Sequence, residues 1–252
     1  LITVGAKPLA ITNCLNFGNP EKEKAMGEFV ECVQGITEAS KYLDFPVVSG
    51  NVSFYNETND KSIKPTPTIG GVGLIKDTKK IINLSLKNEK NTILVVGKTT
   101  GHIEQTLFAR EILGNKKGPP PEINLFNEKN NGHSISELIN KNLILSCHDI
   151  SAGGLLINLA EMCIAGNMGV SVNMPKSLIN PIDYFFSEDQ SRYIIEIVEK
   201  NLENVTKILN NNSVFFENIG KTQKEKLTLN KEFEISINDI KKINNRWFKK
   251  YI

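Results

Sequence analysis

The feature that most constrains the fold is a strand–helix–strand pattern near the start of the chain. Residues 9–15 (LAITNCL) and 45–48 (FPVV) are short apolar segments typical of strands. A helix is predicted between them, to about Leu43, because apolar residues recur every three or four positions. Its predicted buried face consists of Met26, Phe29, Val30, Val33, Ile36, Ser40 and Leu43. Strands and helices in this order indicate a mixed α/β or α+β fold.

The segment NCLNFGNP, residues 13–20, ends the first strand and opens the helix. Asn19 is predicted to cap the helix, and Pro20 suits its first position. The negative charges of Glu21 and Glu23 would interact favourably with the positive end of the helix dipole. Free amides at such a helix start can hold a phosphate. A capped turn without a ligand explains the same residues, and neither GxxxxGK[ST] nor GxGxxG is present here.

The segment PVVSGNVSFYNET, residues 46–58, follows the helix and is predicted to form a loop after the second strand. Gly50 would let a ligand approach the backbone closely, and its own backbone could adopt a positive φ without steric cost. Asn51 offers an amide oxygen suited to Mg²⁺, and Ser53 offers a hydroxyl to a phosphate or polar substrate. A tight turn with Asn51 in a left-handed conformation remains the alternative.

The rest of the chain continues the mixed pattern. Residues 76–91, charged and rich in Asn and Lys, indicate a domain boundary. Strands are predicted at residues 66–74, 92–97, 143–147 and 193–198, with edge strands at 214–220 and 226–229. Helices are predicted at residues 101–113, 134–140, 202–211 and 237–252 and within 148–166, the last of the chain being anchored by Trp247, Phe248 and Tyr251.

Two polar motifs in this later part each have two interpretations. His148 and Asp149 precede Ser151 and a glycine pair. His148 could serve as a base and Asp149 as a metal ligand, whereas a helix cap by Asp149 or Ser151 needs no ligand. Residues 187–192 (SEDQSR), with Glu188 and Gln190, similarly suit either a ligand or a solvated turn.

Composition argues against several classes of partner. The formal charge is +2, from 30 Lys and Arg against 28 Asp and Glu, which gives no support for nucleic-acid binding. The cysteines, Cys14, Cys32, Cys147 and Cys163, lack metal-site spacing and favour a reducing compartment. No apolar run reaches the roughly 20 residues of a membrane helix, and no secretory signal opens the chain. The chain begins with Leu1, so we expect a preceding part to be missing.

Several long blocks, in order along the chain, resemble the phosphoribosylformylglycinamidine synthase family. They are ITNCLNFGNPE (11–21), PVVSGNVSFYNET (46–58), PTPTIGGVGLI (65–75), GHIEQTLFAREILG (101–114), GPPPEINL (118–125), CHDISAGGL (147–155) and FSEDQSRY (186–193). Ordered blocks of this length are far more specific than any short motif above. The resemblance covers nearly the whole chain and places it in the C-terminal portion of the family's enzymes.

The resemblance implies two domains of the aminoimidazole-ribonucleotide-synthetase type, which are also called PurM-like. Residues 1–77 would be the rear part of the N-terminal domain of the enzyme's second half, and 78–90 a linker. Residues 91–225 would be the C-terminal domain, and 226–252 a tail. The first half, which carries the family's catalytic histidine, would be absent, so no catalytic residue is expected in this fragment.

The resemblance also implies an activity in purine biosynthesis. The family converts formylglycinamide ribonucleotide, ATP and glutamine-derived ammonia to formylglycinamidine ribonucleotide, ADP and phosphate, with Mg²⁺. A glutaminase subunit (PurQ), a small third subunit (PurS) and a cytoplasmic location are expected. Alternatives are a non-catalytic nucleotide-binding or assembly module and another ATP-using enzyme of the superfamily, such as aminoimidazole ribonucleotide synthetase.

Four positions match the family's ligand contacts. Asn13 and Gly50 fall at ATP contacts, Asn51 at a magnesium ligand and Ser53 at a substrate contact. Asn13 stands where the family usually has an Asp, and its amide accepts a hydrogen bond without bringing a negative charge. The resemblance assigns no ligand to His148, Asp149, Glu188 or Gln190.

Overall fold

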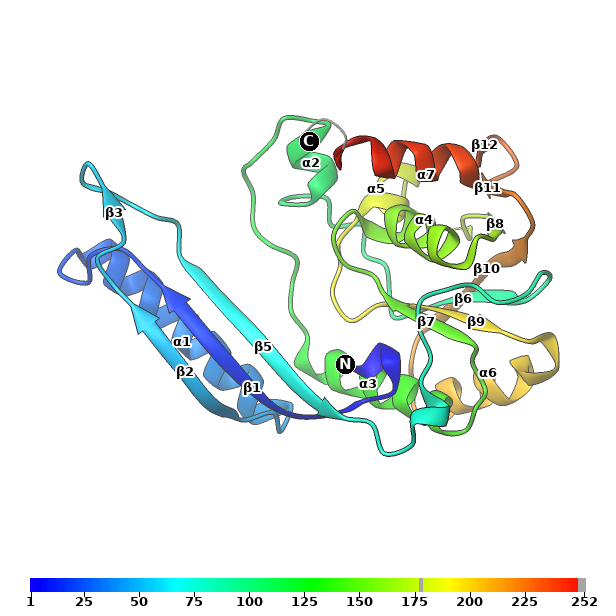
Figure 1. Ribbon diagram of the computed structural model, residues 1–252, viewed down its shortest axis with the longest axis horizontal. Coiled ribbons are helices and arrows are strands. Elements are labelled where there is room, and N and C mark those ends of the chain that lie inside the picture. Colours follow the sequence, from blue (N-terminus) through cyan, green and yellow to red (C-terminus); the bar gives the residue numbers. More distant parts are fainter. Residues whose placement is uncertain (177–178, 249–252) are drawn as a thin grey trace. The chain divides into compact units, whose positions relative to one another are not determined.

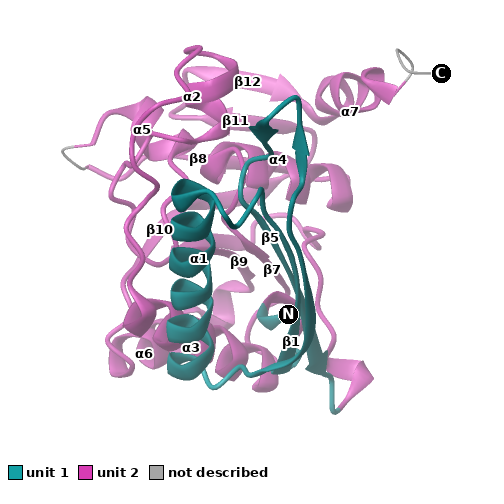
Figure 2. Ribbon diagram, turned by 90° about the vertical axis from the view of Figure 1, so that its left-hand side faces the viewer, with its two compact units in different colours: residues 1–2, 6–76 teal, residues 3–5, 77–252 magenta. Residues whose placement is uncertain are grey.

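The computed structural model describes residues 1–176 and 179–248 (Figure 1). The chain divides into two compact units (Figure 2). Unit 1 comprises residues 1–2 and 6–76, and unit 2 comprises residues 3–5 and 77–252. Each unit combines strands with helices, so the expectation of a mixed α/β or α+β fold is confirmed.

Unit 1 is a three-stranded sheet with one long helix. Its elements are β1 (Lys7–Asn16), α1 (Glu23–Tyr42), β2 (Val47–Ser53), the short hairpin β3 (Glu57–Thr58) and β4 (Lys61–Ser62), and β5 (Thr66–Leu74). Strand β1 lies in the centre, parallel to β2 and antiparallel to β5. The predicted strand–helix–strand unit is therefore present, and β5 has the predicted bounds.

The prediction of a loop directly after residues 45–48 is wrong. Residues 49–53 (SGNVS) continue β2 and pair in register with β1. Neither Gly50 nor Asn51 has a positive φ, which also rules out the tight turn. Gly, Asn and Ser have low strand propensity, but pairing along a neighbouring strand overrides that preference.

The predicted start of the helix is also wrong. Helix α1 begins at Glu23, after Lys22, and no side chain caps it. Asn19 instead accepts a hydrogen bond from the Glu21 amide at 2.8 Å, which closes a local turn before the helix. The predicted buried face is correct only in part, because Met26 and Val30 are 39% and 42% exposed.

Within unit 1, one face of the sheet is covered by a helix. Helix α1 lies along that face (Figure 1), where Ile11 and Leu15 are buried. Phe29 of α1 contacts Phe17 and Phe54 edge to face, with centroids 5.2 Å and 5.0 Å apart. On the opposite face, which we call the open face, alternation along β5 places Val72 and Leu74, 55% and 50% exposed.

Unit 2 is built around a seven-stranded sheet. Its strands lie in the order β12-β11-β8-β10-β6-β9-β7. They are β6 (Thr92–Val96), β7 (Ser146–Asp149), β8 (Gly169–Val172), β9 (Tyr193–Ile197), β10 (Phe216–Gln223), β11 (Lys226–Leu229) and β12 (Phe233–Ser236). Neighbours are antiparallel except β8 and β11. Strands 214–220 and 226–229 were predicted at edges; β10 and β11 are interior, because β8 and β12 were not foreseen.

Helices cover both faces of this sheet (Figure 1). The helices are α2 (Leu107–Glu111), α3 (Leu125–Asn140), α4 (Gly154–Gly166), α5 (Pro181–Phe186), α6 (Leu202–Asn211) and α7 (Ile237–Arg246). Helices α4, α5 and α7 lie on one side, and α3 and α6 on the other. Every residue of β6 and β9 is buried, as three packed layers require.

Three helix predictions in unit 2 need correction, one of which is the helix expected at residues 134–140, since α3 begins already at Leu125. The helix expected at residues 101–113 is only Leu107–Glu111, because Gly101 and Gln105 have positive φ values and Thr106 caps the helix. The terminal helix is held by the buried Ile237, whereas Trp247 and Phe248, which were predicted to anchor it, are 60% and 56% exposed. Tyr251 lies outside the described residues.

Candidate functional site

Asn13 and Gly50 lie opposite each other in the ladder between β1 and β2. A Cβ atom on Gly50 would lie 2.8 Å from Cγ of Asn13 and still closer to its Oδ1. The side chain of Asn13 therefore crosses the space that a larger residue at position 50 would fill. Gly50 is needed at this point for the close approach of Asn13, and not for an unusual φ.

Asn51 and Ser53 point to the other face of the sheet. Successive side chains alternate along a strand, so Gly50 and Asn51 face opposite sides. Asn51 pairs with Cys14 and Ser53 with Asn16, both on the open face. Strand β2 is the edge of its sheet, so its free edge gives access to both faces. The structure thus brings the four predicted residues to one strand pair but divides them between two faces.

Asn56 joins the ends of β1 and β2 just beyond Ser53. Its Nδ2 donates to the carbonyl oxygens of Phe17 at 2.9 Å and of Ser53 at 3.0 Å. The Phe17 amide in turn donates to the Ser53 carbonyl at 3.0 Å. The sequence placed Asn56 only within the loop predicted for residues 46–58, because its partner Phe17 lies 39 positions away and no local pattern marks that contact.

Glu57 fixes the hairpin that follows. Lys22 donates to both of its carboxylate oxygens, at 3.0 Å and 2.9 Å, and Ser62 donates at 2.6 Å. The Asn19 amide donates at 3.1 Å. Hydrogen bonds from Lys22 and Ser62 lower the pKa of Glu57 from 4.5 to about 2. Glu57 therefore remains an anion and ties the hairpin to the start of α1.

The donor set on the open face suits Mg²⁺ only in part. Asn51 and Ser53 offer uncharged oxygen atoms, which Mg²⁺ accepts as ligands. Protein Mg²⁺ sites usually add one or two carboxylates together with phosphate oxygens of a substrate. Among residues 1–176 and 179–248, no group of three or more His, Cys, Asp or Glu side chains could hold a metal ion. Asn51 thus fits Mg²⁺ that arrives with a phosphate-bearing ligand.

The carboxylates of the acidic motif in unit 2 accept hydrogen bonds from backbone amides of the chain itself. Glu188 Oε1 accepts hydrogen bonds from the amides of Leu107 at 2.7 Å and Gly153 at 2.8 Å. Asp189 accepts from the amides of Thr100 at 2.9 Å and Gly101 at 3.0 Å. These carboxylates accept hydrogen bonds from the loops before α2 and α4, so these backbone amides already have acceptors within the chain.

Buried charge in this motif is balanced internally. The Arg192 side chain is 1% exposed and donates to Thr99 Oγ1, the Ser187 carbonyl and the Asp189 carbonyl. Burial raises the pKa of Asp189, but the Thr100 hydrogen bond and the Arg192 charge outweigh it, so the pKa lies below its usual value. Gln190 makes only a 3.4 Å contact with the Glu188 carbonyl.

His148 connects β7 to α4. Its Nε2 lies 2.8 Å from Glu161 Oε2, and its Nδ1 lies 3.4 Å from Asp149 Oδ1. Burial lowers the pKa of His148, but hydrogen bonds to the two carboxylates outweigh it and raise the pKa overall. A histidine whose charged form is favoured is poorly suited to act as a base. Neither Asp149 nor Ser151 caps α4, because Gly153 is its N-cap residue.

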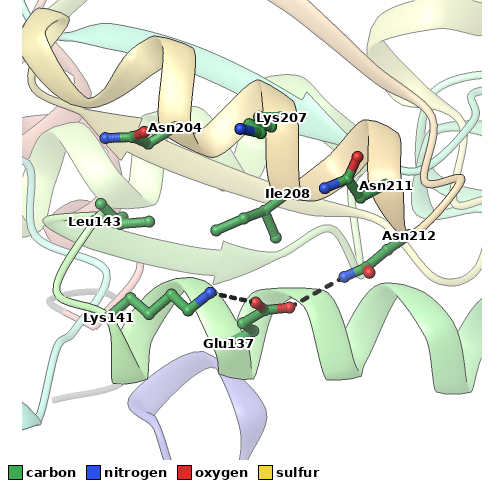
Figure 3. A pocket seen from close by; sticks show the side chains of 8 residues that line it. All are labelled: Glu137, Lys141, Leu143, Asn204, Lys207, Ile208, Asn211 and Asn212. Carbon is green, nitrogen blue, oxygen red and sulfur yellow. Dashed lines mark hydrogen bonds and ion pairs between the residues drawn. The ribbon is translucent and has the colours of Figure 1, made fainter.

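A pocket of about 420 Å³ lies between α3 and α6 (Figure 3). It is lined by Glu137, Lys141, Leu143, Asn204, Lys207, Ile208, Asn211 and Asn212. Glu137 accepts from Lys141 at 2.6 Å and from Asn212 at 3.2 Å, as the dashed lines in Figure 3 show. Three of the polar groups that line the pocket, those of Glu137, Lys141 and Asn212, are thus paired with one another.

The described helices include none that is long and apolar enough to cross a membrane. All four cysteines are free, and Cys147 and Cys163 are buried like apolar residues.

Family models match both parts of the chain. The model "AIR synthase related protein, N-terminal domain" matches residues 1–75, and "AIR synthase related protein, C-terminal domain" matches residues 88–230. A curated relative, phosphoribosylformylglycinamidine synthase subunit PurL of Pelagibacter ubique, is 58% identical over all 252 residues. The chain spans only 34% of that relative's length.

Solved structures of Thermotoga maritima PurL share the fold. The complex with FGAR matches 95% of this chain and 40% of its own, with a TM-score of 0.75 and 18% identity. The complex with ATP matches 95% and 38%, with a TM-score of 0.72 and 16% identity. The PurLQS structure matches 94% and 38%, with a TM-score of 0.71 and 17% identity.

Proposed function

Because the chain belongs to the AIR synthase related protein family, we propose that it forms part of a phosphoribosylformylglycinamidine synthase. The observation that carries the proposal is the 58% identity to Pelagibacter ubique PurL over the whole chain. Residues 1–77 would be the rear part of an N-terminal domain, 78–90 a linker, 91–225 the C-terminal domain and 226–252 a tail. Since the chain spans about a third of that relative, its catalytic residues would lie elsewhere.

The proposed reaction makes a carbon–nitrogen bond at the expense of ATP. The amide oxygen of formylglycinamide ribonucleotide (FGAR) takes the γ-phosphoryl group, and ADP leaves. Ammonia then adds to the carbon that bears this oxygen. The C–O bond breaks, and phosphate departs with the oxygen. A protein site serves phosphoryl transfer mainly by positioning and by stabilising charge. The residues of this chain would contribute positioning.

The free edge of β2 is where we place the ligands. Asn13 and Gly50 would contact ATP on the side that faces α1, where Gly50 leaves room for the Asn13 side chain. Asn51 and Ser53 would contact the Mg²⁺ and FGAR on the open face. An edge strand suits this division, because a ligand along it reaches side chains of both faces.

Mg²⁺ would neutralise charge on the transferring phosphoryl group when bound. Asn51 would supply one amide oxygen, and ATP the phosphate oxygens that this face lacks. Asn13 would accept a hydrogen bond from the nucleotide without adding a charge. A cytoplasmic location, a PurQ-type glutaminase that delivers ammonia and a PurS-type small subunit complete the proposal.

The test uses a hybrid protein, in which this chain replaces the matching third of Pelagibacter ubique PurL. ADP release is measured with ammonium as nitrogen donor, with and without FGAR, beside the unaltered relative. Release that depends on FGAR supports the proposal. An inactive hybrid beside an active relative contradicts it.

A single substitution then tests the magnesium assignment. We expect Asn51→Ala in the hybrid to lower turnover and to shift the Mg²⁺ titration to higher concentration, because one oxygen ligand is lost. Asn210→Ala on α6 is the matched control, since this exposed asparagine lies in unit 2. An unchanged Mg²⁺ titration would remove Asn51 from the site.

The alternative, a nucleotide-binding or assembly module, predicts a different outcome. ATP would bind to the hybrid, but ADP release would not respond to FGAR. Asn13 would then be the first residue to substitute, because its amide replaces the carboxylate that the family resemblance implies.

A further inference from the structure

The side-chain amide of Asn56 has only one orientation that satisfies its surroundings. Its Nδ2 faces two backbone carbonyl oxygens, those of Phe17 at 2.9 Å and of Ser53 at 3.0 Å. A carbonyl oxygen only accepts hydrogen bonds, so the NH₂ group must lie on this side. Both of its protons are therefore committed, and Asn56 holds the ends of β1 and β2 together.

The hydroxyl group of Ser53 lies beside this amide with its proton largely unused. Ser53 Oγ is 3.2 Å from Asn56 Nδ2 and 3.4 Å from Asn56 Oδ1. Hydrogen bonds from a hydroxyl to an oxygen usually measure about 2.5–3.0 Å. At 3.4 Å the Oδ1 atom holds the Ser53 proton weakly, and no other acceptor is recorded for it among the described residues.

We propose that Asn56 is a positioning residue that fixes Ser53 as a hydrogen-bond donor to an oxygen atom of the substrate. This inference rests on the proposed function, in which Ser53 contacts FGAR. The acceptor is an oxygen with available lone pairs, as in a phosphate ester or an amide carbonyl. Asn56 acts through Ser53, since its own donors are consumed by the backbone.

Two substitutions separate the donor from its support. Ser53→Ala removes the hydroxyl, and Asn56→Asp keeps the shape but replaces the NH₂ group by an acceptor facing two carbonyls. In the hybrid protein, we expect each to raise the KM for FGAR about tenfold, the size of one hydrogen bond to a charged acceptor. The KM for ATP should not change. Ser53→Thr, which keeps a hydroxyl, should retain most of the affinity.

The KM for FGAR of the double variant distinguishes a residue that acts through Ser53 from one that only supports the fold. If Asn56 acts through Ser53, Ser53→Ala with Asn56→Asp should be no worse than Ser53→Ala alone. Additive losses would show that Asn56 only supports the fold and would overturn the proposal. An effect on the KM for ATP alone would also overturn it, because the donor would then serve the nucleotide.

The two levels of failure are distinguishable. A hybrid without FGAR-dependent ADP release refutes the proposed function. An active hybrid whose KM for FGAR is unchanged by Ser53→Ala refutes this inference alone, whether or not Asn56→Asp folds. Circular dichroism of each variant identifies those that fold, and Asn210→Ala serves again as the control.

Discussion

The two units use polar residues in opposite ways. In unit 2, Glu188, Asp189 and Arg192 form hydrogen bonds with loops of the chain itself. In unit 1, Asn51 is exposed on an open sheet face, and the Ser53 hydroxyl donates only a long hydrogen bond, of 3.4 Å, to Asn56. As local motifs, both sets suited either a ligand or a ligand-free turn, and only the family resemblance assigned ligands to the set in unit 1. The difference teaches that a polar motif is available to a ligand only where its own chain does not already satisfy it.

The largest expected effect contrasts Asp189 with Asn51. We expect Asp189→Ala to lower the free energy of unfolding by roughly 3–5 kcal/mol, because the amides of Thr100 and Gly101 both lose a charged hydrogen-bond acceptor. Asn51→Ala should change it by less than about 0.5 kcal/mol, as surface substitutions do. Urea unfolding followed by circular dichroism measures both. A small loss for Asp189→Ala would break the contrast between the units.

The same contrast applies to apolar residues. Leu159 on α4 is fully buried, whereas Leu74 on β5 is 50% exposed. We expect Leu159→Ala to cost about 2–5 kcal/mol, because it creates a cavity in a packed core. Leu74→Ala should cost well under about 1 kcal/mol, since little apolar area is lost from contact. Equal losses in urea unfolding of this chain would show that the open face is covered.

Gly50 allows a smaller test inside unit 1. We expect Gly50→Ala to destabilise the protein by about 1–3 kcal/mol, because the new Cβ collides with the Asn13 side chain. In an Asn13→Ala background the loss should shrink, since the two atoms nearest to the new Cβ belong to the Asn13 side chain. Gly35→Ala on α1, where nothing lies within 4 Å, is the matched control and should be stabilising by about 0.5–1 kcal/mol. Independent effects at positions 13 and 50 would contradict the geometry.

Local patterns predicted some elements well and others poorly. Strand β5 and helix α6 have their predicted bounds, and in α6 the buried Val205 and Leu209 recur at helical spacing. Residues 49–53 were misassigned because their strand character comes from pairing with β1 and not from propensity. That error hid the alternation that separates Gly50 from Asn51, so the division of the site between two faces was not foreseen.

The supporting residues of the site were beyond reach of the sequence. Asn56 bonds to a carbonyl 39 positions away, and Glu57 bonds to a lysine 35 positions away. Neither spacing corresponds to a helix turn or a strand repeat, so no periodicity indicates them. Likewise, β8 and β12 are four residues each and carry too few positions for alternation to be recognised.

The smallest expected effect concerns the ion pair between Glu57 and Lys22, the counterpart in unit 1 of the buried charges in unit 2. Folding lowers the pKa of Glu57 from 4.5 to about 2. Such a group stabilises the folded state above its unfolded pKa, and the contribution disappears as the pH falls through the folded pKa. The stability difference between the wild type and Glu57→Gln should therefore be constant from neutral pH to about pH 5 and then shrink toward pH 2. Urea midpoints across this range measure it, with Lys22→Met as the matched variant from the other partner. A difference that persists unchanged in acid would mean that Glu57 acts through its shape, and the hairpin would then depend on packing rather than on charge.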